Sequence, residues 1–326
     1  MRTVVAVVLA FLAACGVWAC LWVNQPMELT SPQVDLSIEP GTSVRQIAQE
    51  ATASGVQVTP SLLYWWFRLS GKSRQIKAGS YEVEAGTSPR GLLSMLVRGE
   101  EAVRSVTLVE GWSFRQVREA LRKADQLKPL TQDLSAQDIM QQLGRQTAAE
   151  GRFFPDTYTY SKGSTDLHVL QRAARAMDKK LAMAWAQRSA QSPLQTPEQA
   201  LILASIVEKE TGRGSDRPLI SAVFSNRLRI GMRLQTDPSV IYGLGDKFNG
   251  NLRKVDLLTD TPWNTYTRAG LPPTPIAMPG KAALLAAVLP ATSKALYFVA
   301  KGDGTSVFST TLEDHNRAVN KYQRGQ

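Results

Sequence analysis

The residues best suited to chemistry lie at the acidic end of one apolar segment. Residues 196–212 read TPEQALILASIVEKETG, a largely apolar run that closes on Glu208 and Glu210. A carboxyl at the end of a buried helix is partly removed from water and faces the negative end of the helix dipole, and both effects raise its pKa. A carboxylic acid that stays protonated near neutral pH can act as a general acid. The pattern favours acid catalysis, although a solvated helix end with two ordinary glutamates has the same sequence.

The sequence also predicts the helix that positions these carboxyls. Thr196 and Gln199 are spaced as a capping box, and Gly212 is typical of a helix end. Seven residues advance an α-helix by nearly two turns, so Glu210 should project on the face of Leu203. We therefore expect a helix that is buried on all sides and carries the acid in its last turn.

Other catalytic chemistries lack their residues in this sequence. Both cysteines, Cys15 and Cys20, lie in the apolar N-terminal segment, and the two histidines, His168 and His315, are far apart. The chain has no Cys/His spacing typical of zinc, no Gly-rich phosphate loop, no Ser-x-x-Lys and no Gly-x-Ser-x-Gly. We expect no metal, no cofactor and no disulfide, and we expect both histidines to be structural. Carboxylate chemistry remains.

The N-terminal segment predicts where the chain acts. Residues 4–23 carry no charge over 20 positions, and a helix of that length spans about 30 Å, enough to cross a bilayer. Arg2 precedes this segment, and Trp18 and Trp22 stand near its far end, where aromatic residues favour the interface. We expect a cytoplasmic stub over residues 1–3, a single-pass anchor in the cell inner membrane and a body in the periplasm.

An alternative for the N-terminus is a lipoprotein signal. Leu12-Ala13-Ala14-Cys15 resembles a lipoprotein box, with Cys15 as the lipid acceptor, but the apolar run continues through Val23. This continuation favours a membrane span, and both interpretations tether the body to a membrane. The net charge of +10 suits an anionic lipid surface or an anionic cell-wall polymer. Nucleic acid is not expected as a partner, because the body is exported.

The exported body reads as an α+β chain with two domains after a polar linker at residues 24–33. Residues 34–103 predict a small α/β module with two strands and three short helices, and this pattern resembles a LysM-like peptidoglycan-binding module. The aromatic run Tyr64–Phe67 could stack on sugars, but core packing is the expectation. Residues 104–326 predict a larger mixed α/β domain, in which Phe153, Phe154 and Tyr158 belong to the core.

Residues 232–280 have little periodicity yet are dense in polar and aromatic side chains, which is typical of loops that line a site. Together with the acidic helix end, they resemble the MltG (YceG-like) family of endolytic murein transglycosylases. The resemblance runs from the anchor to the C-terminus. Its most specific segments are ASIVEKETG, NRLRIGMRLQTDPSVIYG, NTYTRAGLPP, PIAMPG and LYFVA followed by HN.

The resemblance implies roles for particular residues in a catalytic domain with a partly lysozyme-like helical core. Glu210, followed by Thr211, matches the catalytic Glu-Ser/Thr pair of lytic transglycosylases, and Glu208 is the alternative acid. The implied substrate-binding residues are Gln235, Asp237, Asn264 and Tyr266.

These substrate-binding roles have structural alternatives. Asp237 could instead cap the following turn, and Gln235 and Asn264 could satisfy buried loop backbone. The sequence departs from the related pattern at Trp263, where Tyr is usual; this change could alter stacking but not the role of Asn264.

The resemblance also implies the reaction and its partners. The β-1,4 bond between N-acetylmuramic acid and N-acetylglucosamine is cleaved without water to leave 1,6-anhydro ends, with Glu210 as acid and then base. This activity would trim or terminate nascent glycan strands, and the likeness suggests association with peptidoglycan synthases. The alternatives are a non-catalytic glycan-binding scaffold of the cell-wall machinery and a basic substrate-binding lipoprotein.

Overall fold

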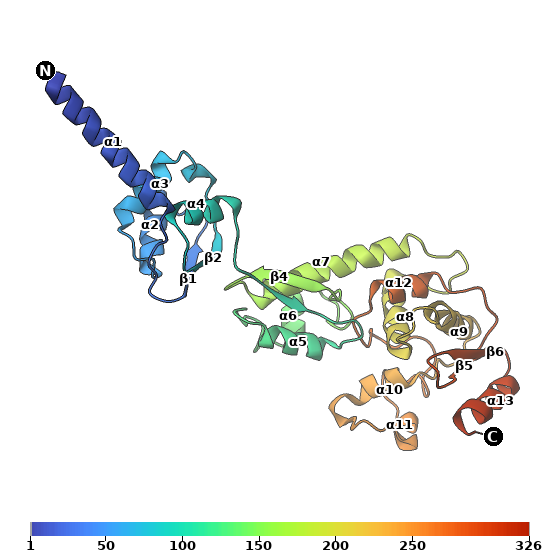
Figure 1. The fold of residues 1–326 in the computed structure, drawn as a ribbon. Coiled ribbons are helices and arrows are strands. Elements are labelled where there is room, and N and C mark those ends of the chain that lie inside the picture. Colours follow the sequence, from blue (N-terminus) through green and yellow to red (C-terminus); the bar gives the residue numbers. More distant parts are fainter. Residues whose placement is uncertain (1, 326) are drawn as a thin grey trace. The chain divides into compact units, whose positions relative to one another are not determined.

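The chain forms two compact units. The structure is a computed structural model and describes residues 2–325 (Figure 1). The first unit comprises the chain up to Arg104 together with residues 159–164, and the second comprises residues 105–158 and the chain from Thr165 onward.

The first unit has an antiparallel pair of strands packed against short helices. Strand β1 pairs with β2 in a register that places Gln33 opposite Glu84 and Ile38 opposite Gly79. Successive side chains of a strand point to opposite faces of the sheet. Leu36 and Tyr81 point toward the core and are at most 1% exposed. The helices and strands expected over residues 34–99 are confirmed. The elements are α1 (Arg2–Asn24), β1 (Gln33–Ile38), α2 (Val44–Ala53), α3 (Pro60–Leu69), η1 (Ser73–Gln75), β2 (Gly79–Glu84) and α4 (Pro89–Arg98).

The aromatic run on α3 divides between core and surface. Phe67 is fully buried, whereas the Trp65 side chain is 57% exposed. Tyr64 and Trp66 pack against the core of the unit, and the Trp66 indole N–H donates to the carbonyl oxygen of Pro89 at 3.0 Å. The expectation that the run is mainly core is confirmed.

Helix α1 is long and apolar enough to cross a membrane, over Thr3–Asn24, and no other helix of residues 2–325 is. The rings of Trp18 and Trp22 stack at 6.3 Å near its end. Trp22 also packs against the core of the first unit, and Val23 is buried. The last turn of the helix therefore packs against the first unit.

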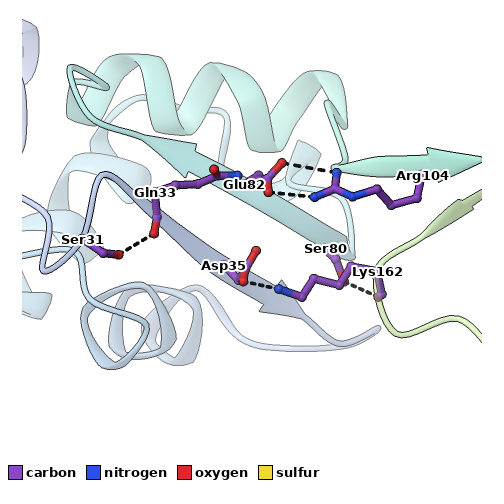
Figure 2. A network of polar contacts seen from close by, with 7 residues as sticks. All are labelled: Ser31, Gln33, Asp35, Ser80, Glu82, Arg104 and Lys162. Carbon is purple, nitrogen blue, oxygen red and sulfur yellow. Dashed lines mark hydrogen bonds and ion pairs between the residues drawn. The ribbon is translucent and has the colours of Figure 1, made fainter. Parts of the chain in front are cut away.

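Polar contacts hold residues 159–164 in the first unit (Figure 2). Arg104 forms a two-pronged ion pair with Glu82, whose shorter distance is 2.9 Å, and Lys162 pairs with Asp35. The carbonyl oxygen of Lys162 also accepts a hydrogen bond from the Ser80 hydroxyl at 3.0 Å. Partly exposed ion pairs contribute little singly, so these contacts act together with the hydrogen bond from Ser80.

The second unit is mainly helical and has a C-terminal hairpin. Strand β5 pairs with β6 so that Tyr297 lies opposite Ser309 and Ala300 opposite Ser306. Strands β3 and β4 form a further two-stranded sheet. The elements of this part of the chain are β3 (Val103–Thr107), α5 (Phe114–Lys123), α6 (Ala136–Gln142), β4 (Thr157–Ser161), α7 (Asp166–Trp185), α8 (Pro197–Glu210), α9 (Arg217–Arg229), α10 (Asp237–Leu244), η2 (Gly245–Lys247), α11 (Lys254–Leu258), α12 (Lys281–Val288), β5 (Tyr297–Ala300), β6 (Ser306–Ser309) and α13 (Leu312–Gln323).

Helix α8 is the centre of the second unit, as its sequence predicts. Every residue from Ala200 to Val207 is buried, and the helix packs against α7, α9 and α12 (Figure 1). The Ser205 hydroxyl accepts a hydrogen bond from the Ile276 N–H at 3.0 Å, which ties the loop before α12 to α8. The expected burial of Phe153, Phe154 and Tyr158 is confirmed as well.

One local expectation about the start of α8 is wrong. The Gln199 side chain accepts from the N–H of Gln195 rather than Thr196, so no reciprocal capping box forms. The expected helix end is confirmed, because α8 ends at Glu210, Thr211 is its extended C-cap and Gly212 follows. Residues 232–280 contain the short helices α10 and α11, whose few residues leave too short a pattern for periodicity to predict.

Candidate active site

Glu210 lies in a cavity of about 460 Å³ at the end of α8. The loop after α9, the start of α10, the loop after α11, strand β5 and helix α13 complete its walls. Of the predicted site residues, the structure brings four to this cavity: Glu210, Gln235, Asp237 and Tyr266.

The Glu210 carboxyl is partly buried and accepts a hydrogen bond at Oε1 from the Thr236 hydroxyl. Burial raises the pKa of Glu210 to about 7. The Thr236 bond and the positive charge of Arg227 oppose this rise, whereas the negative charge of Asp237 adds to it. The expected upward shift is confirmed, and burial is its largest cause. At neutral pH the carboxyl is therefore poised both to give and to accept a proton.

The loop that carries Gln235 is held by Thr265. Gln235 has φ of 49°, a left-handed conformation that is costly for a residue with a side chain. Its N–H donates to the carbonyl oxygen of Thr265 at 3.1 Å, and the next N–H, of Thr236, donates to the Thr265 hydroxyl at 3.0 Å. These bonds fix the strained turn. They leave the exposed Gln235 side chain on the cavity and the Thr236 hydroxyl against Glu210.

Asp237 and Tyr266 form a pair on the wall of the cavity. The Tyr266 hydroxyl donates to Oδ1 of Asp237 at 2.6 Å. No side chain caps the start of α10, so the alternative role of Asp237 as a cap is not seen in the described chain. Burial and the hydrogen bond to Asp237 raise the pKa of Tyr266, and Tyr266 stays a neutral donor.

Asn264 is the predicted site residue that the structure does not bring to the cavity. It is fully buried, and its Nδ2 donates to the carbonyl oxygens of Thr259 at 2.7 Å and Leu257 at 3.1 Å. Its Oδ1 accepts from the N–H of Tyr266 at 2.8 Å. The side chain is thus occupied by loop backbone and has no surface for a sugar. It can act on the cavity only by positioning Tyr266.

Glu208, the alternative acid, points away from the cavity into a structural network. Its side chain is 5% exposed and pairs with Arg217 at 2.8 Å. The second oxygen accepts from the Gly280 N–H at 2.9 Å, at the start of α12. Two residues rotate an α-helix by about 200°, which explains why Glu208 and Glu210 lie in different surroundings. Glu208 joins α8 to α9 and α12.

Arg227, Tyr297 and His315 also line the cavity, although none of them is a site residue predicted from the sequence. Arg227 is 7% exposed and donates to the carbonyl oxygens of Leu234 and Leu296, each at 2.7 Å. These bonds fix the loop that leads to Gln235. The signal for Arg227 was present, because it belongs to the segment NRLRIG that carries the resemblance.

His315 was expected to be structural, yet it lines the cavity, and its ring stacks on Tyr297 at 5.2 Å. Burial lowers the pKa of His315, so the ring is neutral at pH 7. Its Nδ1 is buried and has no hydrogen-bond partner among the described residues. His168, in contrast, is exposed in the first turn of α7. Within residues 2–325, no group of three or more His, Cys, Asp or Glu side chains is arranged to hold a metal ion.

Comparison with known proteins gives one consistent family. The model of the YceG-like family matches residues 36–321. A relative from Bacillus subtilis (strain 168), named endolytic murein transglycosylase, is 30% identical over 318 residues, which cover 91% of this chain and 87% of the relative. A Streptococcus pneumoniae (strain ATCC BAA-255 / R6) protein of the same name is 28% identical and aligns with 96% of this chain, which spans 63% of that longer relative. The crystal structure of a yceG-like protein from Listeria monocytogenes superposes with a TM-score of 0.55 at 26% identity, covering 88% of this chain and 98% of that one.

Proposed function

The chain belongs to the YceG-like family, and we infer that it is a peptidoglycan lytic transglycosylase whose active site is the cavity around Glu210. The names of its relatives support the reaction class. The observation that carries the assignment of the site is a partly buried carboxyl with a pKa of about 7 that shares a cavity with Gln235, Asp237 and Tyr266.

In the proposed reaction, Glu210 first acts as an acid. It donates its proton to the glycosidic oxygen between N-acetylmuramic acid and N-acetylglucosamine, and the bond from that oxygen to C1 breaks. The resulting carboxylate then takes the proton from the C6 hydroxyl of the muramyl residue. O6 forms a bond to C1 and leaves a 1,6-anhydro ring. Glu210 ends protonated again, and no water or cofactor is consumed.

A single carboxyl is sufficient because the nucleophile belongs to the substrate. A hydrolase needs a second carboxyl to act as nucleophile or to activate water. In our proposal the other cavity residues bind and orient. Gln235 and the Asp237–Tyr266 pair supply hydrogen bonds to the sugar, and the stacked rings of His315 and Tyr297 line the cavity beside them. Thr236 orients Glu210, and Asn264 acts indirectly by fixing the backbone at Tyr266.

We also propose the cellular setting. Helix α1 would span the inner membrane once, with residues 1–3 in the cytoplasm, residues 24–33 as linker and the body in the periplasm. Residues 34–103 would form a LysM-like module that binds glycan, and residues 104–326 the catalytic domain with a partly lysozyme-like core. Nascent strands are the proposed substrate and peptidoglycan synthases the proposed partners. Replacing Cys15 by Ala should leave the protein in the membrane, whereas a lipid anchor at Cys15 requires its release.

Product analysis tests this function. Peptidoglycan incubated with the full chain in detergent should acquire 1,6-anhydromuramyl ends, detected by mass, and Glu210→Gln should abolish them. Glu119→Gln removes an exposed carboxyl on α5 and serves as the matched control. Reducing ends would indicate a hydrolase. Binding without any new ends would indicate the glycan-binding scaffold.

A further inference from the structure

A second and larger cavity, of about 730 Å³, lies in the same unit. Its lining includes Lys209, Tyr242 and Trp263, and we name it the Lys209 cavity. Its volume is in the range of cavities that bind small ligands. None of the steps proposed for Glu210 uses it.

The Lys209 cavity and the Glu210 cavity share a wall. At the end of α8, Lys209 lines the Lys209 cavity and Glu210 lines the Glu210 cavity. At the start of α10, Pro238 lines the Lys209 cavity and Asp237 lines the Glu210 cavity. Neighbouring Cα atoms are about 3.8 Å apart, so the linings of the two cavities lie beside each other at both places.

Lys209 is an available cation at this wall. Its side chain is exposed, and it makes no ion pair with any residue of the described chain. Its one hydrogen bond is to the carbonyl oxygen of Gly111, at 3.3 Å. The other cation that lines the cavity, Arg115, is already paired with Asp246. The ammonium group of Lys209 is thus free to pair with an anionic ligand.

The aromatic part of the lining is apolar. The rings of Tyr242 and Trp263 meet edge to face at 5.5 Å. Their polar atoms are satisfied within the protein, since the Tyr242 hydroxyl donates to Glu150 at 3.2 Å and the Trp263 indole to Thr274 at 2.9 Å. Trp263 is also the position at which this sequence departs from the pattern of lytic transglycosylases, in which Tyr is usual. A ligand for this cavity therefore needs aliphatic groups beside a negative charge.

We propose that the Lys209 cavity binds the peptide stem of the glycan being cleaved, with a free carboxylate of the stem paired to Lys209 and its aliphatic side chains on Tyr242 and Trp263. This proposal rests on the proposed function, which places a muramyl residue at Glu210. The stem is attached to that sugar through the lactyl ether at C3. One extended residue spans about 3.3–3.6 Å, so a stem of several residues has the length to extend from one cavity toward the other.

Two forms of one substrate test the proposal. Uncrosslinked strands with intact stems are compared with the same strands after an amidase has removed the stems, using the full chain in detergent. We expect kcat/KM for anhydro-end formation to be about 5–10-fold higher on stem-bearing strands, mainly through KM, as for a partly exposed charge-assisted hydrogen bond. Lys209→Met should remove this difference and Lys209→Arg should keep most of it. Lys294→Met, an exposed lysine outside both cavities, should behave as the unchanged protein.

Equal kcat/KM of the unchanged protein on the two substrates overturns the proposal. A Lys209→Met variant that loses activity equally on both overturns it too, because the cavity then holds sugar or shapes the Glu210 cavity. Should neither substrate yield anhydro ends, the proposed function fails, and dissociation constants decide on the cavity separately. Tighter, Lys209-dependent binding of stem-bearing strands supports the stem site, and equal binding contradicts it.

Discussion

The Thr236 hydroxyl donates a hydrogen bond to Oε1 of Glu210, so the residue before α10 is coupled to the last residue of α8. This bond favours the charged carboxylate and lowers the pKa that burial raises. The position of the proton on Glu210 thus depends on opposing contributions from named neighbours, and each neighbour can be changed singly.

The pH at which kcat/KM falls on the alkaline limb of the pH–rate profile should depend on Thr236 and Asp237. The acid form of Glu210 is active, so kcat/KM should fall above about pH 7. Thr236→Val removes a bond to the carboxylate and should move this limb upward, whereas Asp237→Asn removes a negative charge and should move it downward. We expect shifts of a few tenths of a pH unit to about one unit. Shifts of the same sign in both variants would contradict the assignment of the limb to Glu210.

The backbone conformation of Gln235 should lower the stability of the fold, whereas its side-chain amide should support activity. Gly tolerates the left-handed backbone that Gln235 adopts, whereas Ala does not. Gln235→Gly should therefore be more stable than Gln235→Ala by about 1 kcal/mol in the free energy of unfolding. Both variants lose the side-chain amide, so their kcat/KM values should fall together. Urea denaturation and initial rates measure the two quantities. A Gly variant that is active, or less stable than the Ala variant, contradicts this role.

Asn264 should matter for stability first. Asn264→Ala leaves the buried N–H of Tyr266 and the carbonyl oxygens of Thr259 and Leu257 without this partner. We expect a loss of about 2–4 kcal/mol in the free energy of unfolding, with a lower kcat because Tyr266 is misplaced. Thermal unfolding of the variant measures the first effect. An unchanged melting temperature with a raised KM would instead mean that Asn264 contacts the sugar.

Because of Glu150, the free energy of unfolding should fall as the pH rises. Burial raises the pKa of Glu150 from 4.5 to about 7, although the Phe114 N–H and the Tyr242 hydroxyl donate to it. The folded state therefore holds a proton that the unfolded state has released, and stability falls between about pH 4.5 and pH 7. Glu150→Gln should reduce this slope, by up to about 3 kcal/mol across the interval. Denaturation at pH 5 and pH 8 measures it; parallel slopes in both proteins would contradict the prediction.

Much of this site could be predicted from local sequence. The apolar run of α8 specifies a buried helix with Glu210 in its last turn, and the segment after α9 supplies Gln235 and Asp237. Three-dimensional contacts decided the rest. For Asn264 the sequence left open a sugar contact or a bond to loop backbone, and the amide meets the carbonyl oxygens of Asp256, Leu257 and Thr259. His315 reaches the cavity only because α13 packs against β5.

The charge state of Glu210 is the quantity on which the proposed chemistry depends most directly. Carbon-13 NMR of the full chain labelled at glutamate side-chain carboxyls, compared with Glu210→Gln, isolates the Glu210 resonance by difference. We expect a titration with a midpoint near pH 7. A midpoint near the ordinary value of 4.5 would leave Glu210 without a proton to donate at neutral pH and would contradict its role as the acid.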